Sequence, residues 1–297
     1  MGLVRRPHGH RPDPGPRGAD HLVGHAGPAP TAGQPVTAIV GPTHGVGVAR
    51  SIAVRGMVRI IRRPSIIIPT IVMPVFFLVA FTGSFSGITN IDGYGTDNVF
   101  NWMTPYAVLQ GVSFAGVGAA GMTGEDIENG FFDRLLLTPG PKLPLMLGAL
   151  GYAMLRALIP TTLVLAAALV LGDADLPGGL LGVLILYLGA VGTAAGFACL
   201  GLLAIYRLQS MRALLAIQVP IFALTFLSIG QVPLDFQTGW LRRASELNPI
   251  TPILTMLRQG FLDGVTWADT WPGLVAIAGL IAVFGVPAWI QLRRMAP

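Results

Sequence analysis

Six long stretches of apolar residues, nearly free of charge, follow one another between residues 66 and 292. Each is about as long as the roughly 20 residues that a helix needs to cross a membrane. Because a backbone in lipid must satisfy its own hydrogen bonds, such runs are predicted to be helical. The predicted spans are residues 66–85, 102–123, 145–171, 179–206, 214–234 and 273–292. The pattern predicts an all-α integral membrane protein with six transmembrane helices.

The amino-acid composition also indicates an integral membrane protein. Of 297 residues, 53% are hydrophobic and 11% are charged, and the mean hydropathy is +0.67, outside the range of an ordinary soluble domain. The net charge of +5 is compatible with nucleic-acid binding, but the basic residues are concentrated in short segments that flank apolar runs. Membrane topology accounts for that distribution better, so we expect no nucleic-acid partner. The single cysteine, Cys199, excludes an intrachain disulfide.

The charges of the loops predict which side of the membrane each loop occupies. Segments 87–101 and 172–178 carry only acidic charges, whereas the basic segments are 50–63, 134–142, 207–212 and 293–294. By the positive-inside rule, both termini are cytoplasmic. Arg242, Arg243 and Arg258 depart from this rule, and we interpret their loop as partly folded back.

Two regions precede the first span. Residues 1–45 have little that could bury an apolar face, and we expect a disordered tail. All five histidines lie there, but their irregular spacing without a cysteine partner argues against a metal site. The membrane domain is predicted to span residues 46–297. It begins with a basic amphipathic helix, about residues 47–63, expected to lie on an anionic leaflet.

A charged segment, residues 124–142, lies between the second and third predicted spans. Thr123 can cap a first turn and Asp126 can reach back to it, which predicts that a helix starts here. The helix dipole favours negative charges near the start of a helix, and the acidic residues there are Glu125, Asp126 and Glu128. Apolar residues recur at four-residue spacing at Ile127, Phe131 and Leu135, and the helix ends at Thr138 and Pro139. The pattern predicts a short amphipathic helix at a membrane surface.

The run from Glu128 to Pro139 resembles the cytoplasmic signature of ABC-2 type transporter permeases, an acidic-x-Gly, acidic-x-Leu-x-x-Thr-Pro pattern. It is most similar to the daunorubicin-resistance-type drug exporters of actinobacteria. Phe131 and Phe132 stand where that family usually has a small hydroxyl residue and an aliphatic one. The resemblance implies a bacterial plasma-membrane protein whose coupling helix fits into an ATP-binding subunit. The coupling residues it implies are Glu125, Asp126, Glu128, Gly130, Asp133, Arg134, Thr138 and Pro139.

The stretch from Leu247 to Arg258 is similar to a second pattern of the same permeases, Asn-Pro-x-Thr-Pro followed by Leu-Arg. Pro249 and Pro252 are expected to forbid one continuous helix, and Asn248 suits a cap. The resemblance implies a re-entrant outer loop before the last span. This loop is either an outer gate or a cover over the bundle, and its residues are Asn248, Pro249, Thr251, Pro252 and Arg258.

Arg156 is the only charged residue well inside a predicted span, where an ionised side chain is costly to bury. One interpretation places it in a translocation path or at an anionic substrate. The other lets it reach the interface or bond to helix carbonyls. Gln110 and Gln218 are weaker candidates for the same path.

The glycine-rich stretch at residues 41–51 lacks the Lys and Ser/Thr of a phosphate-binding loop, and the chain's only lysine is Lys142. We therefore expect no cofactor here, with ATP and Mg on a partner chain, and a transport subunit rather than an enzyme. The resemblance implies an exporter of apolar or amphipathic substrates, drug or lipid, that pairs with a second permease copy or a sibling. The alternatives are an ion-coupled secondary transporter and a membrane-embedded enzyme. Neither the intramembrane acid of the first nor the catalytic groups of the second are visible in the spans.

Overall fold

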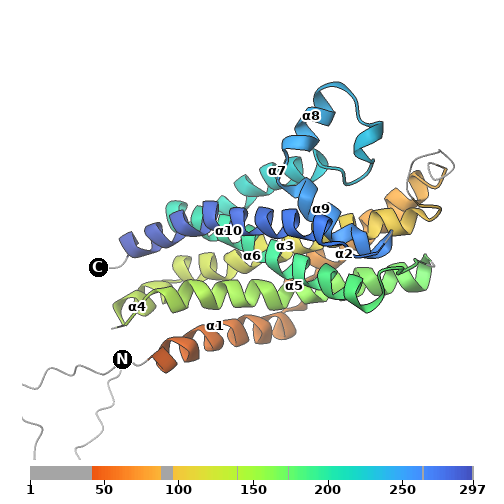
Figure 1. Cartoon of the computed structure of the whole chain (residues 1–297). Helices are drawn as coiled ribbons and strands as arrows, with labels where there is room; N and C mark the ends of the chain where they lie inside the picture. The colour runs from red at the N-terminus through yellow and green to blue at the C-terminus, as the bar shows by residue number, and fades with distance from the viewer. Residues whose placement is uncertain (1–41, 88–95, 139, 173, 263, 296–297) are drawn as a thin grey trace, which may run out of the picture. The chain divides into compact units, whose positions relative to one another are not determined.

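The computed structural model describes residues 42–87, 96–138, 140–172, 174–262 and 264–295. Every regular element in these ranges is a helix (Figure 1). Residues 1–41 of the expected disordered tail, with His8, His10, His21 and His25, lie outside the described residues, whereas residues 42–45 belong to the first helix, so the predicted end of the tail is wrong. The α-helices are α1 (Pro42–Arg62), α2 (Ile68–Ser84), α3 (Val99–Glu128), α4 (Phe131–Leu137), α5 (Leu143–Leu171), α6 (Gly179–Leu208), α7 (Arg212–Phe226), α8 (Gly239–Leu247), α9 (Ile250–Arg258) and α10 (Trp267–Met295). Short 3-10 turns are η1 (Pro64–Ile66), η3 (Leu234–Phe236) and η4 (Gln259–Phe261).

Helix α3 lies at the centre of the bundle and is buried along most of its length. It packs against α2, α5 and α6, and also against α7 and α9. Small residues let the helices approach closely, since a Cβ at Gly116 would lie 2.5 Å from the Ala194 carbonyl of α6. Close packing of this kind is what holds helices together where lipid surrounds them.

Three of the described helices are long and apolar enough to cross a membrane, namely α5, α6 and α10. Helices α2 and α7 are apolar but have only 17 and 15 residues. At 1.5 Å per residue α7 extends about 22 Å, less than the roughly 30 Å of a hydrocarbon layer. The chain is therefore a helical membrane protein with several long apolar helices, and the number six stays a prediction.

The predicted fifth span, residues 214–234, is wrong at its end, because α7 stops at Phe226. Residues 228–230 are buried beyond that point without being helical. The Ser228 hydroxyl donates to the Thr225 carbonyl at 2.6 Å, and a Cβ at Gly230 would lie 2.3 Å from the Tyr106 ring. Only a bare backbone fits against Tyr106 at this position, so the chain turns where a longer hydrophobic run predicted helix.

The basic helix α1 begins at Pro42, earlier than predicted, and packs lengthwise along the first turns of α5 (Figure 1). Glycines on both helices make the contact close. A Cβ at Gly148 would lie 2.7 Å from Ile52, and one at Gly56 would lie 2.4 Å from the Tyr152 ring. One face of α1 is thus covered by α5, while Arg62 and Val46 remain exposed on other faces.

Candidate functional site

The charged corner between α3 and α4 differs from the predicted helix. Thr123 does not cap a new helix; it is buried inside α3, which continues to Glu128. The helix then ends because Gly130 adopts a left-handed conformation, with φ of 67°, and α4 starts at Phe131. Glycine adopts that conformation without steric penalty and is a common helix terminator. The single helix expected over this segment is therefore two helices joined by a tight turn.

This division reverses the electrostatics expected for Glu125 and Asp126. Both lie at the C-terminal end of α3, where the helix dipole disfavours negative charge. Two arginines of α1 compensate, because Arg55 pairs with Asp126 and Arg59 pairs with Glu125. The Asp126 side chain is only 13% exposed, so its pair with Arg55 is more than a solvated surface contact.

Arg55 also joins the third helix of the corner. Its guanidinium lies 4.7 Å from the centre of the Phe131 ring in α4, a cation–π distance. An open pocket of about 490 Å³ lies between α1 and α4, lined by residues that include Ile52, Phe131 and Leu135. The corner is thus one structure built from α1, α3 and α4.

Glu128 forms hydrogen bonds with other residues of the same chain. Its Oε1 accepts hydrogen bonds from the Met211 backbone N–H at 2.7 Å and from the Ser210 hydroxyl at 3.3 Å. These groups lie at the start of α7, where free N–H groups and the helix dipole favour an anion. Glu128 therefore connects the end of α3 to the beginning of α7.

Helix α4 divides into a buried face and an exposed one. Phe132 and Leu136 are buried, and the Phe132 ring stacks on Tyr206 with centroids 5.9 Å apart. Lys142 donates to the carbonyls of Leu136 and Thr138 at the end of the helix. The exposed residues of α4 include Asp133, Arg134 and Leu137, and Thr138 beyond them is also exposed. Pro139 lies outside the described residues.

Arg156 is buried in the bundle, with 3% of its surface exposed. Its Nη2 donates to the Thr70 hydroxyl of α2 at 2.8 Å. The guanidinium occupies space that Gly118 of α3 leaves open, since a Cβ there would lie 2.5 Å from Nη1. Arg156 also lines a pocket of about 180 Å³ together with Arg59 and Glu125 of the charged corner.

The two glutamines predicted for the path lie elsewhere. Gln110 donates to the Tyr106 hydroxyl at 2.9 Å and to the Thr225 hydroxyl at 3.3 Å, which ties α3 to α7. Gln218 lies on α7, and its Nε2 is buried without a hydrogen-bond partner among the described residues. Neither lines the Arg156 pocket, so the structure does not bring the three path candidates together.

The Asn248–Pro249 step separates α8 from α9, as the sequence pattern predicts. Asn248 Oδ1 accepts from the Ile250 N–H at 2.9 Å, and its Nδ2 donates to the carbonyls of Leu224 and Leu227. Pro252, by contrast, lies in the first turn of α9 and does not interrupt it. Proline is tolerated there because those N–H groups have no intrahelical acceptor.

Thr251 and Arg258 fix the same loop from α9. The Thr251 hydroxyl donates to the Ser245 carbonyl of α8 at 2.6 Å. Arg258, 2% exposed, donates to the carbonyls of Trp102, Ile229 and Gly230 at 3.1 to 3.3 Å.

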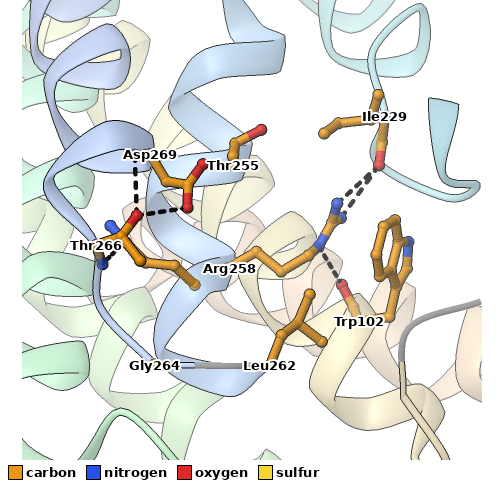
Figure 2. A pocket seen from close by; sticks show the side chains of 9 residues that line it. Trp102, Ile229, Thr255, Arg258, Leu262, Gly264, Thr266 and Asp269 are labelled. Atoms are coloured by element: carbon orange, nitrogen blue, oxygen red, sulfur yellow. Dashed lines mark hydrogen bonds between the residues drawn. The ribbon is translucent and has the colours of Figure 1, made fainter.

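Figure 2 shows the Arg258 guanidinium between Ile229 and Trp102, and its Cζ lies 3.6 Å from the centre of the Trp102 ring. A pocket of about 310 Å³ adjoins it, with Thr266 and Asp269 on the opposite wall. Arg258 fastens α9 and the turn after α7 to the central helix α3.

Sequence reasoning did not identify the partners of these residues. It placed residues 55 and 59 within a basic helix without assigning partners to them, and it did not propose Thr70 or Trp102 as site residues. Hydroxyls and backbone carbonyls are common acceptors, so their role depends on how the chain folds.

Comparison with known proteins agrees with this architecture. A model of the ABC-2 type transporter family matches residues 48–262 of the chain. A protein described as daunorubicin resistance ABC transporter permease protein DrrB1, from Streptomyces coeruleorubidus, is 27% identical over 245 residues, covering 81% of this chain and 83% of that protein. The chain belongs to the ABC-2 type transporter permeases, multi-pass membrane proteins that act as transport subunits.

Proposed function

We propose that this chain is the membrane-spanning permease subunit of an ATP-driven exporter that moves an apolar or amphipathic substrate outward. Membership of the ABC-2 family implies an ATP-binding partner subunit. The name of the Streptomyces relative refers to daunorubicin resistance, which supports a drug as cargo. Charged residues are scarce in the apolar helices, and this favours substrates with few charges, drug or lipid.

The proposed topology has six spans, with both termini cytoplasmic and a re-entrant outer loop before α10. Support comes from the arrangement of basic segments. Figure 1 shows α4 and the last turns of α10 at the same end of the bundle, and Glu128 brings the loop before α7 to that end as well. Basic loops that gather at one end are expected on the cytoplasmic side. A second permease copy or a sibling permease would complete the transport unit.

The observation that carries the proposal is the corner where α1, α3 and α4 meet. Asp133 and Arg134 extend from its exposed face and are available to a partner subunit. The same corner is bonded inward, through Asp126 to α1 and through Glu128 to α7. When an ATP-binding subunit displaces this corner, α1 and α7 would therefore move together. The bundle would then alternate between two arrangements.

Other predicted residues have supporting roles in this proposal. In this proposal Arg156 belongs to the cytoplasmic half of the path, while Gln110 joins α3 to α7 and Gln218 lies on α7. Asn248 and Arg258 would set the position of the outer loop, which then acts as a gate or as a fixed cover. The density of hydrogen bonds around Arg258 favours the fixed cover.

The test is co-purification of the chain with its ATP-binding subunit from detergent. We expect the double variant Asp133→Lys with Arg134→Glu to lose the subunit, because both exposed charges of α4 are reversed while the buried face is untouched. Asp175→Lys is the matched control, since Asp175 is an exposed acid on the loop between α5 and α6. Retention of the subunit by the double variant would place the docking surface elsewhere.

A further inference from the structure

We propose that the pocket beside Arg156 binds one anionic group, a phosphate or carboxylate, at the head of an amphiphile. The pocket has a mouth and a floor. At the mouth, the side chains of Arg59 and Glu125 are 25% and 35% exposed. At the floor, Arg156 is 3% exposed and bonded to Thr70. An anion can therefore enter from the surface and reach a buried guanidinium.

One face of α3 forms a wall of this pocket. Gly118, Gly121 and Glu125 lie on one face of the helix at spacings of three and four residues. The seven-residue step from Gly118 to Glu125 corresponds to about 10 Å along the axis. All three residues line the pocket. The pocket therefore extends along α3 from the charged corner to Arg156, whose guanidinium fills the space beside Gly118, while the side-chain ends of Leu214 and Met211 lie beside Gly121.

The charges of the walls select the sign of the ligand. Two arginines and one glutamate line the pocket, so its walls carry a net positive charge. Glu125 is already paired with Arg59, which reduces its repulsion of an incoming anion. A guanidinium in a low-dielectric site binds phosphate or carboxylate through strong, geometrically specific hydrogen bonds.

The size of the pocket limits what can enter. A volume of about 180 Å³ is smaller than the roughly 300 to 1,000 Å³ of pockets that enclose a drug-sized ligand. It suits a headgroup whose apolar remainder stays outside. The inference goes beyond the proposed function, and its test needs only this chain, so that a failure of ATPase docking does not affect it.

The test is a binding titration of the full chain in neutral detergent. The probes are dioctanoyl phosphatidic acid, inorganic phosphate and dioctanoylglycerol, which supplies the same tails without an anion. We expect the anionic lipid to bind at least tenfold more tightly than the neutral one. Inorganic phosphate should bind more weakly than the anionic lipid, because it lacks the apolar tails that stay outside the pocket. Binding of inorganic phosphate as tightly as the anionic lipid would show that the site takes a free small anion and would overturn the assignment to an amphiphile.

Variants separate the pocket from the basic surface of α1. Arg156→Gln should weaken binding of the anionic lipid at least tenfold, while Arg62→Gln, an exposed arginine of the same corner, should change it less than twofold. Gly121→Ala narrows the pocket without changing its charge, and the new Cβ would meet only the flexible ends of Leu214 and Met211 at 3.0 and 3.6 Å. It should also weaken binding, and it covers the case in which Arg156→Gln does not fold. Wild-type affinity in both pocket variants, or an equal loss in Arg62→Gln, would overturn the proposal.

Discussion

Two arginines of this permease are buried to nearly the same degree, yet their surroundings differ. Arg258 is 2% exposed and Arg156 is 3% exposed. Arg258 bonds to three backbone carbonyls, lies against the Trp102 ring and lines a pocket of about 310 Å³. Arg156 bonds to the Thr70 hydroxyl, interacts with the Tyr152 side chain, packs against Gly118 and lines a pocket of about 180 Å³. Burial of a charge therefore does not by itself assign a role.

The comparison teaches that the acceptors around a buried cation are more informative than its depth. Backbone carbonyls belong to the fold, so a guanidinium that bonds to several of them holds segments of chain in place. Arg156 interacts with the side chains of Thr70 and Tyr152 instead, and these contacts do not fix a stretch of backbone. An intramembrane charge is a functional hypothesis by default, and here the default suits Arg156 better than Arg258.

The largest expected effect comes from removing Arg258, which joins three backbone segments. Arg258→Leu should destabilise the protein by about 3 kcal/mol, because carbonyls of Trp102, Ile229 and Gly230 lose their donor in a buried place. Thermal unfolding in detergent measures the change. A melting temperature equal to that of the wild type would mean that the turn after α7 is held by other contacts.

Filling the space beside Arg156 should cause the next largest loss of stability. Gly118→Ala would place a Cβ 2.5 Å from Arg156 Nη1 and should cost about 1 to 3 kcal/mol by overpacking. Gly279→Ala in α10 is its control, since no atom lies within 4 Å of the new Cβ. We expect the control to unfold at or slightly above the wild-type temperature. Equal unfolding of the two variants would contradict the close fit around Arg156.

Removing Arg156 itself should affect stability less. Arg156→Leu is expected to cost no more than about 1 kcal/mol, because replacing a buried charge with an apolar side chain relieves its desolvation. The same unfolding experiment, run beside Arg258→Leu, tests the ranking directly. If Arg156→Leu unfolds as easily as Arg258→Leu, both arginines are structural and the contrast between them disappears.

The smallest expected effect on stability concerns Arg55, which is partly exposed. The Arg55–Asp126 pair should show a coupling energy of about 0.5 to 1 kcal/mol in a double-mutant cycle of alanine variants. Its coupling should fall in high salt, since the Arg55 side chain is 40% exposed. Additive effects of the two single variants would show that the pair does not hold α1 to α3.

Hydrophobic pattern alone predicted where the long helices lie, but not all of their ends. The apolar run after Phe226 continues in sequence, while the turn there depends on Gly230 fitting against Tyr106, more than 120 residues away. At the charged corner, the local start signal at Thr123 is overridden because nothing breaks α3 before Gly130. Local propensity is a weak prior when neighbouring helices supply the packing.

The candidate site was predictable in its residue types and not in its pairings. The acidic residues near Glu128 and the intramembrane Arg156 stand out in the sequence because charges are rare in apolar surroundings. The bond from Arg55 to Asp126 joins positions 71 residues apart, and the acceptors of Arg258 are backbone carbonyls. Every residue carries such a carbonyl, so no sequence pattern distinguishes the ones that are used.

The central position of α3 has a consequence for how the protein is made. During synthesis α3 emerges before the helices that cover it, and among the described helices it is not one of the three that are long and apolar enough to cross a membrane. The helices that cover it, α5 and α6, follow it in the chain. We expect the insertion machinery to retain α3 until residue 208 has been synthesised, so that a nascent chain stopped after α4 would be a target for membrane proteases.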